Sequence, residues 1–184
     1  MTTLKQELPH TIEEIEALPE GERAELINGE IYYMSSPSVT HQRIVMNLSA
    51  AIHSYIRNNK GKCEVFPSPF AVYLFGIQDD TNYLEPDIVV VCDPEKTANE
   101  KGCDGAPDFV IEVVSPSTAS RDYLYKLNQY QRAGVKEYWI VNPDIRSVTR
   151  YDFANKDGSN AFSFNDAVPC LTFPGLAVCI NDYL

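Results

Sequence analysis

Long apolar runs are absent from this sequence of 184 residues. No stretch approaches the roughly 20 consecutive apolar residues that a membrane-spanning helix needs, so we expect no membrane span. The N-terminal residues, MTTLKQELPHTIEEIEALPE, are acidic and lack the apolar stretch of a secretory signal peptide. Both absences lead us to expect a cytoplasmic protein.

Positive charge is also scarce, because 15 Lys and Arg residues stand against 26 Asp and Glu residues and give a net charge of −11. Broad, nonspecific binding of nucleic acid depends on many Lys and Arg contacts to phosphates, so this balance argues against it. A local basic rim is still compatible with the sequence, in two clusters: Arg57, Lys60 and Lys62, and Arg121, Lys126 and Arg132.

The five cysteines include no CxxC pair, which argues against a zinc ribbon and against a thioredoxin-like site. We expect most of them to be reduced. Cys92 and Cys179 fall in apolar, strand-like runs, where a cysteine behaves as a small hydrophobic residue.

The sequence does contain enough apolar material for a core. Hydrophobic residues make up 44% and charged residues 22%, and we find neither a repeat nor a low-complexity segment. The length suits a single domain over residues 1–184.

Periodicity and turn residues predict a mixture of helices and strands. Asn28-Gly29 between two strand-like runs predicts a hairpin, and apolar residues at helical spacing predict a long helix over residues 38–59. A buried strand at 109–114, a helix at 120–133 and a strand in KEYWIVNP form a candidate parallel crossover. Further expected elements are a helix at 11–18, strands at 63–66, 70–75, 87–92, in SVTRYDF and in the tail, and a surface loop at 93–107. The fold class is therefore α/β (α+β), with a central mixed β-sheet flanked by helices and an N-terminal hairpin.

Two carboxylates stand in or beside apolar strand-like runs. Glu112 lies within DFVIEVV, and Asp87 begins DIVVV. A buried carboxylate must be protonated, paired or bound to a metal ion. If the two strands are neighbours, the pair suits Mg²⁺, which can polarise a phosphoryl oxygen and generate a hydroxide nucleophile. The alternative is that Asp87 caps a turn after Pro86 and that Glu112 pairs with a Lys or Arg.

Three further residues have two interpretations each. Lys126 lies at the margin of an apolar helical stripe, where its ammonium reaches toward the sheet or forms a solvated pair with Asp122. His41 lies on the apolar stripe of the long helix, either as a structural histidine or as an acid–base or water-positioning group. Glu25 precedes the hairpin turn and lies close to Arg23 in the sequence. Without further information, we interpret it as an exposed residue of a charged hairpin.

Several motifs occur in a specific order from about residue 24 to residue 151: AELINGEIYYMS, His41, EPDIVVV, PDFVIEVVSPST and RDYLYKLNQYQRAGVKEYWIVNP. The sequence thereby resembles the family described as "putative restriction endonuclease", which is abundant in cyanobacteria and belongs to the PD-(D/E)XK nuclease superfamily. The resemblance implies a restriction-endonuclease-like core, a nucleic-acid partner, DNA in the first place, and a homodimer. Aromatic residues expected to be exposed at its interface are Tyr32, Tyr33, Phe162 and Phe164.

The resemblance also implies roles for individual residues. Asp87 matches the acid of the "PD" motif and Glu112 the second acid, which together bind Mg²⁺, with Mn²⁺ as a substitute. The usual lysine two residues later is Val114 here, and Lys126 matches a lysine that has moved to the following helix. The remaining matched catalytic positions are Glu25 and His41.

These residues predict an Mg²⁺-dependent endonuclease that hydrolyses phosphodiester bonds of nucleic acid. Two alternatives stay open. One is a catalytically inactive binding or regulatory module that keeps the nuclease fold. The other is a metal-independent sugar hydrolase with paired carboxylates.

Overall fold

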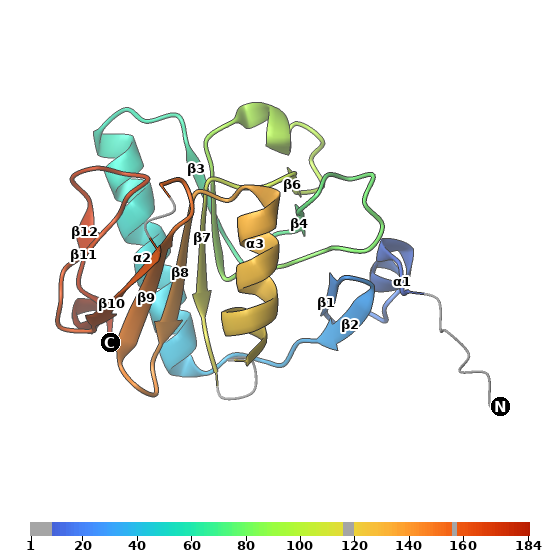
Figure 1. Cartoon of the computed structure of the whole chain (residues 1–184), viewed down its shortest axis with the longest axis horizontal. Helices are drawn as coiled ribbons and strands as arrows, with labels where there is room; N and C mark the ends of the chain where they lie inside the picture. The colour runs from blue at the N-terminus through green and yellow to red at the C-terminus, as the bar shows by residue number, and fades with distance from the viewer. Residues whose placement is uncertain (1–8, 116–119, 156–157) are drawn as a thin grey trace.

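A mixed β-sheet forms the centre of the protein, whose computed structural model describes residues 9–115, 120–155 and 158–184 (Figure 1). The six strands follow the order β10-β9-β8-β7-β5-β3. The neighbours β7 and β8 are parallel and the other pairs of this sheet are antiparallel, so the predicted mixed sheet is confirmed. The strands are β3 (Glu64–Pro67), β5 (Ile88–Val91), β7 (Phe109–Val113), β8 (Glu137–Asn142), β9 (Ser147–Asp152) and β10 (Gly158–Ser163).

Two helices cover opposite faces of this sheet, as Figure 1 shows. They are α2 (Val39–Asn58) and α3 (Leu127–Ala133), the second of which continues a π-helical segment (Arg121–Lys126). Successive residues of a strand point to opposite faces, so Ile111 packs in the core under α2 while Val110 packs in the core under α3. Strand β7 is therefore buried on both sides, which places Glu112 in an apolar setting.

The long helix α2 has clear local causes. The hydroxyl of Ser38 accepts a hydrogen bond from the backbone N–H of His41 at 3.2 Å and caps the first turn. Ile44, Leu48 and other residues at helical spacing are fully buried against the sheet. The prediction of a helix over residues 38–59 is confirmed.

The N-terminal hairpin is also confirmed, with β1 (Ala24–Ile27) pairing antiparallel to β2 (Glu30–Tyr33). Asn28 and Gly29 form its two-residue turn with φ values of 51° and 78°, the left-handed conformation that such a turn requires. The hairpin does not stand alone, because the backbone N–H of Leu26 donates to the carbonyl of Tyr83 at 2.7 Å. The segment around Tyr83 therefore lies against β1, and all four residues of β1 are buried.

Several short elements surround the sheet and correct two expectations. The strand expected at 70–75 is only β4 (Val72–Tyr73), and it pairs with β6 (Cys103–Asp104), which lies inside the expected surface loop at 93–107. Cys103 is fully buried, because β6 packs its side chain into the core under α3. The remaining elements are α1 (Ile12–Glu16), β11 (Val168–Pro169), β12 (Ala177–Val178) and two 3₁₀ segments (Pro94–Thr97 and Ile180–Tyr183). Among the described residues, we find no helix whose length and apolar character would allow it to span a membrane.

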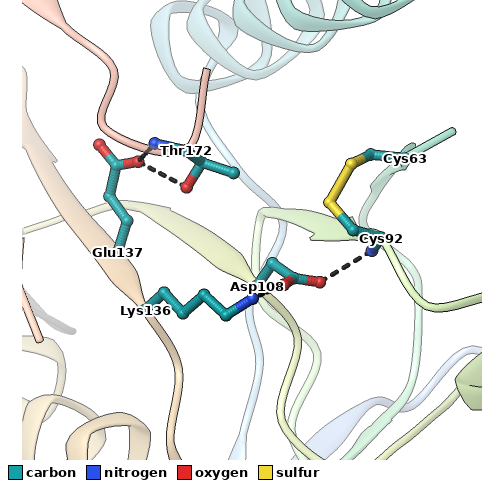
Figure 2. Close-up of a disulfide and its surroundings, with 6 residues drawn as sticks. All are labelled: Cys63, Cys92, Asp108, Lys136, Glu137 and Thr172. Atoms are coloured by element: carbon teal, nitrogen blue, oxygen red, sulfur yellow. Dashed lines mark hydrogen bonds and ion pairs between the residues drawn. A yellow bond between two sulfur atoms is a disulfide. The ribbon is translucent and has the colours of Figure 1, made fainter. Parts of the chain in front are cut away.

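The buried carboxylate of Glu137 connects the C-terminal segment to the sheet through hydrogen bonds (Figure 2). Glu137 accepts hydrogen bonds from the backbone N–H and the hydroxyl of Thr172, both at 2.7 Å, and from the indole of Trp139 at 2.7 Å. Phe164 lies fully buried in the core under α2, so the expectation that it is exposed at an interface is wrong. Val168 and Val178, which pair β11 with β12, belong to the same buried cluster as this ring.

A disulfide joins Cys63 and Cys92 at the edge of the sheet (Figure 2). Strands β3 and β5 pair Glu64 with Val91, and one further step along this register brings the two cysteines opposite each other. The expectation that Cys92 acts as a small hydrophobic residue is therefore wrong. The cysteines that remain free are Cys103, Cys170 and Cys179, in agreement with the expectation that most are reduced.

Reduction of the Cys63–Cys92 disulfide is expected to lower the free energy of unfolding by roughly 3 kcal/mol, because the crosslink restricts the unfolded chain between strands β3 and β5. Urea unfolding of the oxidised protein, the reduced protein and a Cys63→Ser variant measures this loss. Cys179→Ser, which removes a free thiol, serves as the control. Equal stability of the oxidised and reduced proteins would contradict the prediction.

Candidate functional site

The register of the sheet brings Asp87 and Glu112 together. Strands β5 and β7 pair Ile88 with Ile111, and the next step of this antiparallel register sets Asp87 opposite Glu112. The backbone N–H of Val113 donates to Oδ2 of Asp87 at 2.7 Å, which holds this carboxylate against the end of β7. Directly opposite residues share one face of a sheet, so both carboxylates face the same side.

Lys126 joins this pair from the π-helical segment. Its Nζ lies 2.9 Å from Oε1 of Glu112 and 2.8 Å from Oε1 of Glu25, and 3.5 Å from Oδ1 of Asp122. Only 3% of Lys126 is exposed. This burial excludes a solvated pair with Asp122, and the expectation that Lys126 lies at the margin of an apolar helical stripe is wrong. Asp122 and Lys126, four residues apart on this segment, are both buried, and π-helical turns are frequent at functional sites.

Glu25 reaches the same lysine from strand β1. Its Oε1 also accepts the backbone N–H of Glu85 at 3.1 Å. Its Oε2 is buried without a hydrogen-bond partner among the described residues, and Nε of Arg121 lies 4.0 Å away. The expectation that Glu25 is an exposed residue of a charged hairpin is wrong. The segment that follows Tyr83 covers β1 and leaves Glu25 fully buried.

His41 completes the group from the first turn of α2. Its Nε2 lies 3.1 Å from Oδ2 of Asp87, and its side chain is 15% exposed. Its Nδ1 is buried and has no hydrogen-bond partner in the described part of the chain. This arrangement lets the imidazole orient Asp87 from the first turn of α2.

All five side chains predicted from the sequence line one pocket of about 880 Å³. The pocket lies between the hairpin, the start of α2 and the π-helical segment, at the end of strands β5 and β7. The five residues are Glu25, His41, Asp87, Glu112 and Lys126. By contrast, the buried carboxylate of Glu137 is satisfied by its own donors and does not line this pocket.

The pocket is electrostatically unbalanced. Its described lining carries six carboxyl side chains against three cations, which are Arg23, Arg121 and Lys126. The carboxyl side chains are those of Glu25, Glu85, Asp87, Glu112, Asp122 and Asp144. Burial, followed by the charges of Asp122, Asp87 and Glu25, raises the pKa of Glu112 to about 8, although Lys126 acts in the opposite direction. Burial alone would lower the pKa of Lys126, but the charges of Glu112, Glu25 and Asp122 hold it well above its usual value. An added cation would relieve the excess negative charge.

A divalent metal ion fits this donor set in one particular form. In the described part of the chain, no three His, Cys, Asp or Glu side chains are grouped so that they could hold a metal ion by themselves. Mg²⁺ commonly uses one or two carboxylates and completes its shell with water and substrate phosphate. Asp87 and Glu112 supply such a pair, and Oε2 of Glu25, which accepts no hydrogen bond from the described residues, is a further oxygen in the same pocket.

Two contributors to the site were missed by the sequence interpretation. Tyr130 donates its hydroxyl to Oε1 of Glu112 at 2.8 Å, and its position four residues after Lys126 was the available signal. Arg23 donates to Oε2 of Glu85 through Nε at 2.8 Å and to Oγ of Ser68 at 2.7 Å. No local pattern links Arg23 to Glu85, because the hairpin meets that segment only in the folded chain.

The free energy of unfolding of the metal-free protein is expected to fall as pH rises from 4.5 to about 8. A carboxyl whose pKa is higher in the folded chain keeps a proton that the unfolded chain has lost, so its stabilisation is full at low pH and disappears through this interval. Urea unfolding in EDTA measures the slope, to which one such group contributes at most about 1.4 kcal/mol per pH unit. Glu112→Gln, which cannot titrate, should flatten it; equal slopes for both proteins would contradict the assignment of the shift to Glu112.

A mixed sheet with helices on both faces and acidic side chains at the ends of two neighbouring strands defines a restriction-endonuclease-like fold class. A crystal structure described as "a putative nuclease belonging to DUF820" from Anabaena variabilis shares this fold, with a TM-score of 0.75. The match covers 95% of this chain and 97% of that chain at 23% sequence identity.

The family model described as "Putative restriction endonuclease" (Uma2) matches residues 12–180, and the chain belongs to this family. Two relatives come from Synechocystis sp.. "Uncharacterized protein slr1290" is 30% identical over 138 residues, which are 74% of this chain and 69% of the relative. "Uncharacterized protein sll1609" is 28% identical over 132 residues, which are 71% of this chain and 72% of the relative.

Proposed function

We propose that this protein is an Mg²⁺-dependent endonuclease that hydrolyses phosphodiester bonds of DNA. The observation that carries the proposal is the contact of Lys126 with Glu112, directly beside Asp87 and inside one pocket. Two carboxylates and a cation are the groups that phosphodiester hydrolysis needs: ligands for a metal ion and a positive charge for the phosphoryl group. The position two residues after Glu112, where the superfamily usually has a lysine, holds Val114. Lys126 of the π-helical segment takes the place of that lysine.

Asp87 and Glu112 would hold the metal ion, which polarises a phosphoryl oxygen and lowers the pKa of a bound water when present. Lys126 lies where its ammonium can orient the attacking water or stabilise the developing phosphoryl charge. Glu25 fixes the position of Lys126 through its 2.8 Å contact. His41 orients Asp87 through the contact of its Nε2 with Oδ2 of that carboxylate.

Addition of Mg²⁺ or Mn²⁺ is expected to raise the melting temperature, because a ligand that binds only the folded state stabilises it by mass action. Asp87→Asn should abolish this rise, since it removes one charged ligand. Asp144→Asn is the matched control, because Asp144 lines the same pocket but lies outside the carboxylate group around Lys126. A full metal response in Asp87→Asn would contradict the metal assignment.

A catalytically inactive binding module remains the second candidate, because the position two residues after Glu112 is the buried Val114 rather than a lysine. A metal-dependent rise in melting temperature without cleavage of any single-stranded or duplex DNA would favour this candidate. The homodimer, the single domain and the cytoplasmic location stay predictions, and sedimentation velocity tests the first of them.

A further inference from the structure

Two exposed tyrosines and one half-buried tyrosine lie beside the pocket. We call Tyr32, Tyr33, Tyr125 and Arg121 the aromatic rim. Tyr33 is 63% exposed at the end of strand β2, and Tyr125 is 52% exposed on the π-helical segment. Tyr33 and Arg121 line the pocket itself, so the rim is continuous with the candidate active site.

Three members of the rim form a connected group, and Tyr33 lines the pocket beside it. The guanidinium carbon of Arg121 lies 5.3 Å from the ring centre of Tyr32. The rings of Tyr32 and Tyr125 lie 6.5 Å apart between centres. Tyr32 is further fixed by a 2.8 Å hydrogen bond from its hydroxyl to Glu30. These contacts hold flat π surfaces in place, which lowers the entropic cost of stacking another ring on them.

The cations of the pocket, by contrast, are already engaged. Arg23 forms an ion pair with Glu85, and Lys126 is buried against Glu25 and Glu112. Arg121 is stacked on the rim. Duplex DNA is held mainly by Lys and Arg contacts to its phosphates, and this pocket offers few of them. Single strands can instead be held by stacking of their bases on aromatic rings, with a contribution from Arg.

We propose that the aromatic rim stacks unpaired bases, so that the pocket receives a single-stranded or locally unpaired nucleic acid rather than a continuous duplex. This inference rests on the proposed nuclease function, since it names the form of the substrate for the same pocket. Every base has a π face, so such a rim selects unpaired strands without selecting a sequence.

The test measures binding by fluorescence anisotropy in Ca²⁺, with gels to establish that the probes stay uncut. The probes are a short labelled oligothymidylate, an abasic oligonucleotide with the same number of phosphates, and a duplex of the same length. The oligothymidylate is expected to bind at least tenfold more tightly than the other two, because only its bases are free to stack.

Variants of the rim identify where stacking occurs. Tyr33→Ala and Tyr125→Ala are each expected to weaken oligothymidylate binding by about 5- to 100-fold, the range of one lost base–aromatic contact. Tyr33→Phe and Tyr125→Phe keep the ring and should retain affinity. Phe75→Ala is the matched control, because Phe75 also packs against an arginine, Arg132 at 5.7 Å, but does not line the pocket. Unchanged melting temperatures exclude unfolding as the cause.

Several results would overturn the inference: equal affinity for the oligothymidylate and the abasic probe, no binding of either, or full affinity in both alanine variants. Sedimentation showing a dimer that Tyr33→Ala separates would also overturn it, because the rim would then be an interface between two copies. Base-dependent binding without any Mg²⁺-dependent cleavage would instead count against the nuclease function alone. Duplex cleavage that the tyrosine variants leave unchanged would count against the rim alone.

Discussion

Lys126→Met is expected to reduce the rate of phosphodiester cleavage on the order of 10²- to 10³-fold, the usual cost of removing one charge-stabilising group from an active site. The methionine keeps much of the apolar stem and removes the ammonium that lies 2.9 Å from Glu112. Lysine is a cation and does not ligate Mg²⁺, so the metal-dependent rise in melting temperature should remain. Loss of cleavage with retained metal binding is the result that identifies Lys126 as catalytic.

The measurement is single-turnover cleavage of a labelled single-stranded oligonucleotide, expressed per folded protein. Lys136→Met is the matched control, because this lysine also pairs with an aspartate, Asp108 at 2.6 Å, but does not line the pocket. It should cleave at the rate of the wild type. Full activity in Lys126→Met would refute the idea that this helix supplies the missing lysine of the active site.

The same substitution is expected to lower the free energy of unfolding of the metal-free protein by roughly 3–5 kcal/mol, the typical cost of breaking a buried ion pair. Lys126 is in contact with three carboxylates and is itself 3% exposed, so its removal leaves buried negative charge without a counter-charge. Urea unfolding in EDTA measures the loss. Mg²⁺ should restore part of it by neutralising the same charges.

A second substitution separates charge from packing. Glu25→Gln should destabilise the wild type, because it weakens a 2.8 Å ion pair. It should stabilise Lys126→Met, because it removes a buried charge whose remaining described cation, Arg121, lies 4.0 Å away. This reversal of sign in a double-mutant cycle is the expected signature of direct coupling. If the two losses simply add, the destabilisation of Lys126→Met comes from packing and the charge argument fails.

The parts of the fold that were predictable have strong local causes. Asn28-Gly29 fixed the hairpin turn because few other residue pairs adopt its left-handed conformation at low cost. Helix α2 followed from its apolar spacing and from the cap at Ser38. Asp87 and Glu112 were found because charged residues in apolar strands require a special explanation, and the register of β5 and β7 then set them opposite each other.

The remainder depended on contacts that no local pattern encodes. A search for an apolar stripe does not identify a helix face that is lined by charged residues, so it did not reveal the burial of Lys126 beside Asp122. Glu25 was expected to be exposed because the chain around Tyr83, which covers it, is distant in sequence. The disulfide at Cys63 and Cys92 required the exact pairing of β3 with β5, which the spacing of the cysteines does not reveal.

The pairing of Asp87 with Glu112 also has a kinetic meaning. A shift of β5 against β7 by one residue would turn the side chains of one strand to the other face and separate the two carboxylates. During refolding, the ability to bind Mn²⁺ should therefore appear only when these strands have reached their native alignment. Stopped-flow measurement of Mn²⁺ binding would then report when the two strands align. We expect this alignment to occur later than collapse or helix formation.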